Sequence, residues 1–367
     1  MKRSLLQLPM FALIVAGMVI GIDTGLGRLG IAMPGPAAER VMLHGPILNA
    51  GVFRTLIALE RAVAMKTLLG RTWTFADLAP VLGGAGLIVL LVQGATTPAV
   101  ALMAAGAAVL VLVNLYFLRR SPTLDVLTMV LGAMFLLLAD LAWLTGRPVA
   151  SLTPWWVAFL VLTIVGERLE LAKLRAHGQT AQVTFGLAVA AYIGALLLMV
   201  VDEGLGMRLS GVGMIALTVW LLRYDIALLT VRLSGLPQFV AACLISGYVW
   251  LGIGGAVVLL NEPVFAGFSY DAYLHAVALG FVFSMVFGHA PIIFPAVIER
   301  PIGYTPFAYV PLALLHFSVA LRILADLAGN QRVRQAAGVW TGAAIVLYGA
   351  FIVYGLVRGD PRSWNSR

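Results

Sequence analysis

Charged residues are scarce in this sequence. Only 11% of its 367 residues are Asp, Glu, Lys or Arg, whereas 61% are hydrophobic. A soluble domain carries roughly a quarter charged residues, so this chain has too few polar side chains to cover a globule in water. The deficit excludes a soluble globular protein and predicts an integral membrane protein.

Cysteine is almost absent, since Cys243 is the only one. A single cysteine excludes an internal disulfide and any zinc or iron–sulfur site built from cysteines. Basic patches interleaved with aromatic residues are also missing. The net charge of +8 therefore does not predict a nucleic-acid partner, because retention of Lys and Arg on the cytoplasmic side of a membrane explains it. The predicted partner is the lipid bilayer.

Long apolar runs, by contrast, recur along the whole chain. A helix of about 20 residues crosses roughly 30 Å of hydrocarbon. The predicted spans are 8–24, 41–63, 76–95, 97–118, 124–144, 152–171, 180–200, 208–223, 237–260, 270–298, 305–328 and 336–357. Because the loops between them are short, we expect one all-α domain over residues 1–367, a transmembrane bundle of about twelve helices. No small-residue cleavage site follows the first run, so we expect it to be a retained span.

The basic residues of the short loops predict the orientation of these spans. The face predicted to be cytoplasmic carries Lys2, Arg3, Lys66, Arg71, Arg119, Arg120, Arg168, Lys173, Arg175, Arg223, Arg232, Arg300, Arg358, Arg362 and Arg367. The opposite face carries Arg28, Arg40, Arg147, Arg208, Arg332 and Arg334. Both termini are therefore predicted to be cytoplasmic. The protein is expected to lie in the inner membrane of a bacterium.

Four of the five histidines lie inside predicted spans, where polar side chains usually serve a function. His44 opens the second span and His275 the tenth, and both spans run from outside to inside. We therefore expect these two imidazoles to lie at similar depth, near the outer surface. His177, in a loop rich in charges, is expected to be solvated.

The other two intramembrane histidines predict a second, inner level. His289 follows His275 by 14 residues, which places it about 21 Å deeper and about 40° around the same helix. His316 lies on the next span, about as far beyond the turn near residue 302 as His289 lies before it. Imidazole is the commonest metal ligand, so this pair is a candidate for copper or iron. A third ligand would come from Glu60, Tyr309 or solvent.

Each histidine also has a structural interpretation, in which it forms a hydrogen bond between packed helices. Small residues share a helix face with His44, which suits either a flat macrocycle or a neighbouring helix; they are Gly51, Thr55, Ala58 and Ala62. Pro291 and Pro311 predict kinks close to His289 and His316. Such kinks either make room for a ligand or adjust packing.

Charged residues within the spans need partners. Arg54 lies near the middle of the membrane, and its predicted acceptor is Asp140, Glu60 or an acidic group of a cofactor. Arg322 and Asp326, four residues apart, are expected to pair with each other. The dipeptide Glu-Arg recurs at three cytoplasmic helix ends, where we expect interfacial ion pairs; the repeats are Glu60-Arg61, Glu167-Arg168 and Glu299-Arg300.

The predicted architecture resembles subunit I of the haem-copper oxidases. It has twelve spans, with one histidine at the outer end of the second span and another at the outer end of the tenth. The segments HGPILNAGVFRTLIALER and LHAVALGFVFSMVFGHAP are also similar to parts of the NnrS family, membrane proteins associated with haem, copper and nitric-oxide stress. The resemblance implies that His44 and His275 are axial ligands of haem b, and it offers His289 and His316 for a second metal or haem.

The chain departs from the oxidases at one important point. It has no histidine between spans two and ten except His177 in a loop, whereas the oxidases carry copper ligands on spans six and seven. Reduction of oxygen to water is therefore not expected. Two classes stay open: a haem- or metal-binding membrane protein, redox-active or linked to nitric-oxide metabolism, and a secondary transporter or channel whose path is lined by proline-kinked helices.

Overall fold

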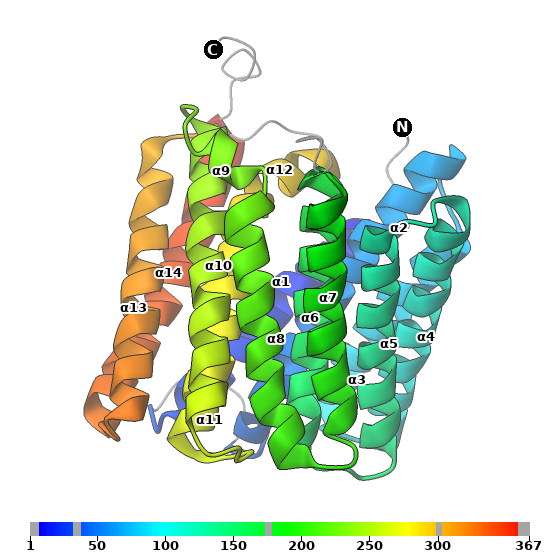
Figure 1. Ribbon diagram of the computed structural model, residues 1–367. Helices are drawn as coiled ribbons and strands as arrows, with labels where there is room; N and C mark the ends of the chain where they lie inside the picture. Colours follow the sequence, from blue (N-terminus) through cyan, green and yellow to red (C-terminus); the bar gives the residue numbers. More distant parts are fainter. Residues whose placement is uncertain (1–6, 32–37, 173–177, 299–302, 359–367) are drawn as a thin grey trace. The chain divides into compact units, whose positions relative to one another are not determined.

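The computed structural model describes residues 7–31, 38–172, 178–298 and 303–358. Within these ranges the regular elements are all helical, so the all-α prediction is confirmed (Figure 1). The chain falls into two compact units, Met1–Glu167 and Arg168–Arg367. That they act as the single domain predicted for residues 1–367 stays a prediction.

The first unit contains long helices connected by short turns. In chain order its elements are α1 (Gln7–Arg28), the 3-10 helix η1 (Ala38–Leu43), the π-helix η2 (Pro46–Phe53), α2 (Arg54–Leu69), η3 (Phe75–Asp77), α3 (Leu78–Gln93), α4 (Thr97–Arg120), α5 (Leu124–Leu144) and most of α6 (Val149–Ala172). Consecutive helices α3, α4 and α5 pack side by side (Figure 1).

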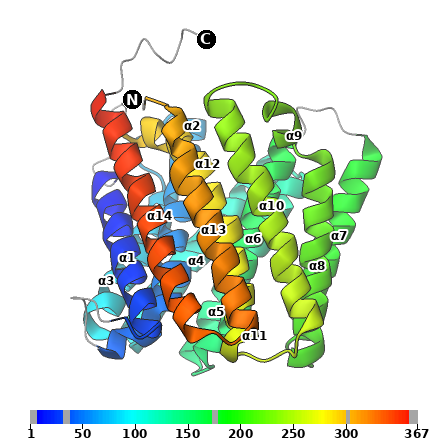
Figure 2. The ribbon, with the colours of Figure 1, turned by 90° about the vertical axis from the view of Figure 1, so that its left-hand side faces the viewer.

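The second unit also contains long helices, and a π-helix interrupts one of them. Its elements are α7 (Gln179–Leu198), α8 (Glu203–Tyr224), α9 (Ala227–Thr230), α10 (Leu236–Leu260), α11 (Gly267–His275), the π-helix η5 (Ala276–Val282), α12 (Phe283–Ile298), η6 (Pro306–Ala308), α13 (Tyr309–Leu327) and α14 (Gln331–Arg358). Helices α13 and α14 form an extended pair (Figure 2).

Eleven helical segments of the described chain are long and apolar enough to cross a membrane. They coincide with eleven of the predicted spans, with ends that differ by a few residues. The predicted span 41–63 is different, because η1, η2 and α2 divide it. Pro46 is the first residue of the π-helix, a position where the missing N–H of proline costs no hydrogen bond within the helix.

The predicted span 270–298 is helical throughout, but its middle is a π-helix. It consists of α11, η5 and α12 in direct succession. Helix α12 continues through Pro291, so the kink expected there stays a prediction, and a π-helical stretch lies upstream, between His275 and His289. Single π-helical turns inside α-helices occur frequently at functional sites.

Glycines allow the closest helix contacts inside each unit. A Cβ on Gly106 of α4 would come within 2.9 Å of the Gly83 nitrogen on α3. In the second unit, a Cβ on Gly255 of α10 would lie 2.7 Å from the carbonyl oxygen of Gly211 on α8. Close packing of small residues is the usual source of helix association in lipid.

Candidate functional site

His44 lies two residues before the π-helix η2, and its ring packs against α1. Its Nδ1 is 2.8 Å from the carbonyl oxygen of Gly21. Because a carbonyl oxygen only accepts hydrogen bonds, Nδ1 carries the proton and donates it, and Nε2 of the neutral ring bears the lone pair. Gly25 makes room for this ring, since a Cβ there would be 2.7 Å from the His44 Cε1. Helix α1 thus supplies both the acceptor and the space.

His275 is the last residue of α11 and directly precedes the π-helix η5. Its Nδ1 is 2.8 Å from the carbonyl oxygen of Asp271, one turn earlier, and 3.3 Å from Oδ2 of the same residue. Both are acceptors, so this imidazole too carries its proton on Nδ1. The two histidines predicted to be a pair therefore share a tautomer and a position next to a π-helix, each within its own unit.

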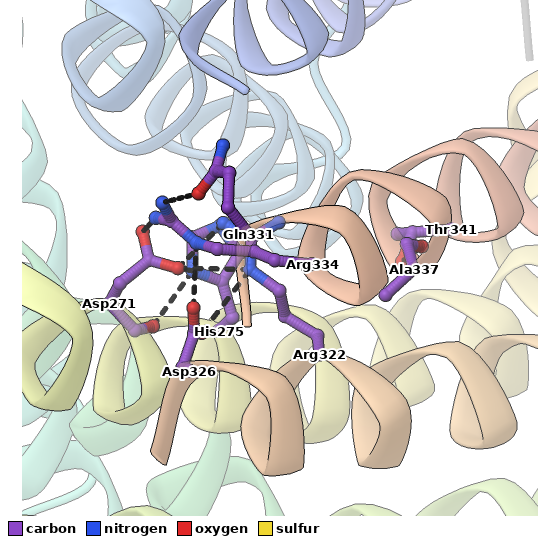
Figure 3. Close-up of polar contacts among 8 residues, drawn as sticks. All are labelled: Asp271, His275, Arg322, Asp326, Gln331, Arg334, Ala337 and Thr341. Carbon is purple, nitrogen blue, oxygen red and sulfur yellow. Dashed lines mark hydrogen bonds and ion pairs between the residues drawn. The ribbon is translucent and has the colours of Figure 1, made fainter. Parts of the chain in front are cut away.

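The Asp271 carboxylate belongs to a cluster of charges contributed by α11, α13 and α14 (Figure 3). Its Oδ2 is 2.6 Å from Nη2 of Arg322, and its Oδ1 is 3.1 Å from Nη2 of Arg334. The same two arginines contact Asp326, at 3.2 Å from Arg322 Nε and 2.6 Å from Arg334 Nε. The predicted pairing of Arg322 with Asp326 is confirmed, as one part of a larger network.

His289 repeats the pattern of the outer histidines inside α12. Its Nδ1 is 2.7 Å from the carbonyl oxygen of Met285 and therefore donates to it. This bond fixes the ring in the tautomer whose lone pair is on Nε2. A metal ligand usually has this arrangement, with its second nitrogen donating to a carbonyl or carboxylate.

His316, on α13, has the opposite tautomer. Its Nδ1 accepts a hydrogen bond of 2.8 Å from Nε1 of Trp250 on α10, because an indole N–H only donates. The two rings are nearly parallel, at 15°, with centroids 6.3 Å apart. The proton must then be on Nε2, which is buried and has no hydrogen-bond partner among the residues that the structure describes.

The position of Trp250 depends in turn on Gly280 of the π-helix η5. A Cβ on Gly280 would lie 2.8 Å from Cδ2 of the indole, and closer still to other atoms of Trp250. The absence of a side chain at residue 280 therefore lets α10 and η5 approach each other. The π-helix that begins after His275 thus also positions the partner of His316.

Arg54 begins α2 in the interior of the first unit, with 1% of its side chain exposed. Its Nη2 is 2.6 Å from Oδ1 of Asp140, whose other donor is Nε1 of Trp156 at 3.1 Å. Asp140 is therefore the acceptor among the three alternatives predicted. The Nε and Nη1 atoms of Arg54 are buried without a partner within the described ranges. A role for Arg54 in binding a cofactor stays a prediction.

Glu60 lies six residues further along α2, and its side chain is exposed. The neighbouring Arg61 is 3.2 Å from Oε1 of Glu167, so two of the three Glu-Arg repeats are joined by an ion pair, as predicted. Glu299 and Arg300 lie outside the described residues, as does His177.

The described part of the chain contains no group of three or more His, Cys, Asp or Glu side chains able to hold a metal ion. The predicted inner site combines His289 and His316 of the second unit with Glu60 of the first, and it stays a prediction. The alternative third ligand, Tyr309, begins α13 and packs edge-on against Phe239 at 5.2 Å between ring centroids.

Sequence reasoning missed several partners of the histidines. Asp271 was detectable, because it lies four residues before His275 and therefore on the same helix face. Gly25, Trp250 and Arg334 were not detectable, because each comes from another helix and its contact depends on how the helices pack.

Fold and geometry together define an all-helical protein with many long apolar helices and buried ion pairs. Residues 7–357 match the family described as a domain of unknown function, DUF8744, and the chain belongs to this family. No curated protein matches the chain.

Proposed function

We propose that this chain is a haem-binding protein of the bacterial cytoplasmic membrane, with twelve spans and both termini in the cytoplasm. His44 and His275 are the proposed axial ligands of haem b. Bound haem would supply one-electron redox chemistry. The resemblance to haem-copper oxidases and to NnrS proteins connects this chemistry with nitric-oxide metabolism rather than with oxygen reduction.

The observation that supports the proposal most strongly is the tautomer of the two histidines. In each unit, the Nδ1 of the histidine beside the π-helix donates to a backbone carbonyl, at 2.8 Å in both cases. Haem iron binds the lone pair of a neutral imidazole, and a hydrogen bond from the other nitrogen orients the ring. Both rings therefore have the chemistry of axial ligands. The proposal that His44 and His275 bind the same haem rests on the sequence. Each lies at the start of a predicted span that runs from the outside to the inside of the membrane.

In this proposal the residues around the two histidines orient the imidazole rings. The carbonyl oxygens of Gly21 and Asp271 hold the Nδ1 protons, and the hydrogen of Gly25 leaves room for the His44 ring. None of these tasks needs a catalytic acid or base, and the proposal assigns no catalytic residue.

A second proposed site, for copper or iron, consists of His289, His316 and Glu60. His289 has the tautomer that a metal ligand needs. For His316 to bind a metal through Nε2, its proton must leave or move to Nδ1, which breaks the bond from Trp250. Metal content of His289→Ala and His316→Ala tests the site: we expect coupled loss of one metal, and unchanged content in both variants would show that these rings serve packing.

A transporter is the second candidate function, and one observation favours it. The π-helix η2 leads directly into Arg54, which forms a buried ion pair with Asp140 in the predicted membrane interior. Interrupted helices and buried charges mark the substrate paths of many transporters.

An absorption spectrum of the purified full-length protein distinguishes the two candidates. The haem proposal predicts a Soret band and sharp α and β bands after reduction with dithionite, at close to one haem per chain. Protein expressed with excess haem precursor that still shows no haem band would contradict the proposal and leave the transporter as the better account.

A further inference from the structure

Asp271 stands out because one carboxylate contacts the proposed haem ligand and two arginines from other helices. Its Oδ2 lies 3.3 Å from the His275 Nδ1, while Arg322 donates to it through Nη2 at 2.6 Å and Nε at 3.0 Å. Arg334 of α14 approaches the other oxygen at 3.1 Å. Figure 3 shows Asp271 at one side of this cluster, with dashed lines marking its contacts.

A carboxylate beside the Nδ1 proton changes the properties of an imidazole ligand. Its negative charge stabilises positive charge on the ring, which makes the opposite nitrogen a stronger electron donor to a bound metal, while the backbone carbonyl keeps the Nδ1 hydrogen bond. Stronger donation stabilises Fe(III) relative to Fe(II) and lowers the reduction potential. The arginines limit this effect, because they neutralise part of the carboxylate charge.

We propose that Asp271 is a positioning residue that sets the reduction potential of the haem through His275. Arg322 and Arg334 hold its carboxylate in place from α13 and α14. This inference rests on the proposed function, because it requires haem on His275. It assigns to the charge cluster a role beyond joining three helices.

Asp326 provides a matched control for the charge itself. It contacts the same two arginines, at 3.2 Å and 2.6 Å, and its side chain is fully buried. It comes from α13, however, whereas Asp271 lies one turn before His275 on the ligand's own helix. Removing either carboxylate leaves the same excess of positive charge on the arginine pair, but only Asp271 lies one turn from the ligand with its carboxylate against Nδ1.

The test is a redox titration of the full-length protein carrying Asp271→Asn or Asp326→Asn. We expect Asp271→Asn to shift the Fe(III)/Fe(II) equilibrium at least tenfold toward Fe(II), which for one electron is about 59 mV upward. Asp326→Asn should shift it several-fold less. Equal shifts in both variants would show a general charge effect, and an unchanged potential in Asp271→Asn would show no effect; either result overturns the inference.

Asp271→Glu keeps the charge and moves the carboxylate by one methylene, so it serves if Asp271→Asn does not fold. A positioning role predicts a changed potential and changed low-spin g values in its electron paramagnetic resonance spectrum. Wild-type values in Asp271→Glu would contradict the inference. Wild-type protein without haem contradicts the proposed function instead, so the two failures are distinguishable.

Discussion

Arg54 and Asp140 form an ion pair of 2.6 Å, with side chains that are 1% and 0% exposed. Removing one partner leaves an uncompensated buried charge, which typically costs about 3–5 kcal/mol. We therefore expect Arg54→Met or Asp140→Leu alone to lower the thermal stability of the detergent-solubilised protein strongly.

The double variant Arg54→Met/Asp140→Leu is the control for this prediction. It removes both charges, and replacing a whole buried pair by apolar residues is often neutral. Its melting temperature should lie closer to wild type than that of either single variant. Additive losses in the double variant would show that the two residues act independently.

Gly25 is predicted to be essential for the His44 ring. Gly25→Ala places a Cβ 2.7 Å from the ring, so the imidazole must move or α1 must shift. Such overpacking costs typically about 1–3 kcal/mol, and we expect reduced haem content at unchanged expression. Gly194→Ala in α7 is the matched control, because a Cβ there meets no atom within 4 Å among the described residues. Equal haem content in both variants would contradict the prediction.

Trp250 is predicted to stabilise the second unit through His316. Trp250→Phe removes the indole donor to the His316 Nδ1 and should cost about 1–3 kcal/mol, because a partly buried acceptor loses its partner. Cys243, the only cysteine and fully buried, allows unfolding to be followed with a thiol-reactive dye. Trp340→Phe, at an indole that is 49% exposed, is the control. Equal melting temperatures for the two variants would mean that the hydrogen bond contributes nothing.

The orientation of the chain is predicted by its basic loops. Reporter fusions at residue 177 and after residue 367 should both show cytoplasmic activity, because Lys and Arg are retained on that side. A periplasmic signal at either position would mean that the number of spans differs from twelve.

Much of the architecture was predictable, because the length of each apolar run corresponds to the length of a helix. The predicted span 124–144, for example, has the same first and last residues as α5. The pairing of Arg322 with Asp326 followed from their spacing of four residues, and the buried Arg54 required an acceptor, which is Asp140. These features depend on local spacing or on the cost of burying a charge.

The features that were not predicted depend on tertiary packing. The π-helices η2 and η5 are mostly apolar, like the α-helices beside them, so mean hydropathy does not distinguish them. The tautomer of His316 is set by Trp250, which is 66 residues away in sequence. Arg334 reaches Asp271 only because α14 packs beside α13. Such contacts are specified by the fold rather than by spacing along the chain.

The most direct test of the central proposal is the electron paramagnetic resonance spectrum of the oxidised protein and of three histidine variants. Haem held by these two imidazoles should give a low-spin ferric signal, which His44→Ala and His275→Ala should each abolish while the protein still inserts into the membrane. His177→Ala should keep the signal, because this histidine is not one of the proposed ligands. A wild-type signal that survives in both His44→Ala and His275→Ala would contradict the assignment of these residues as haem ligands.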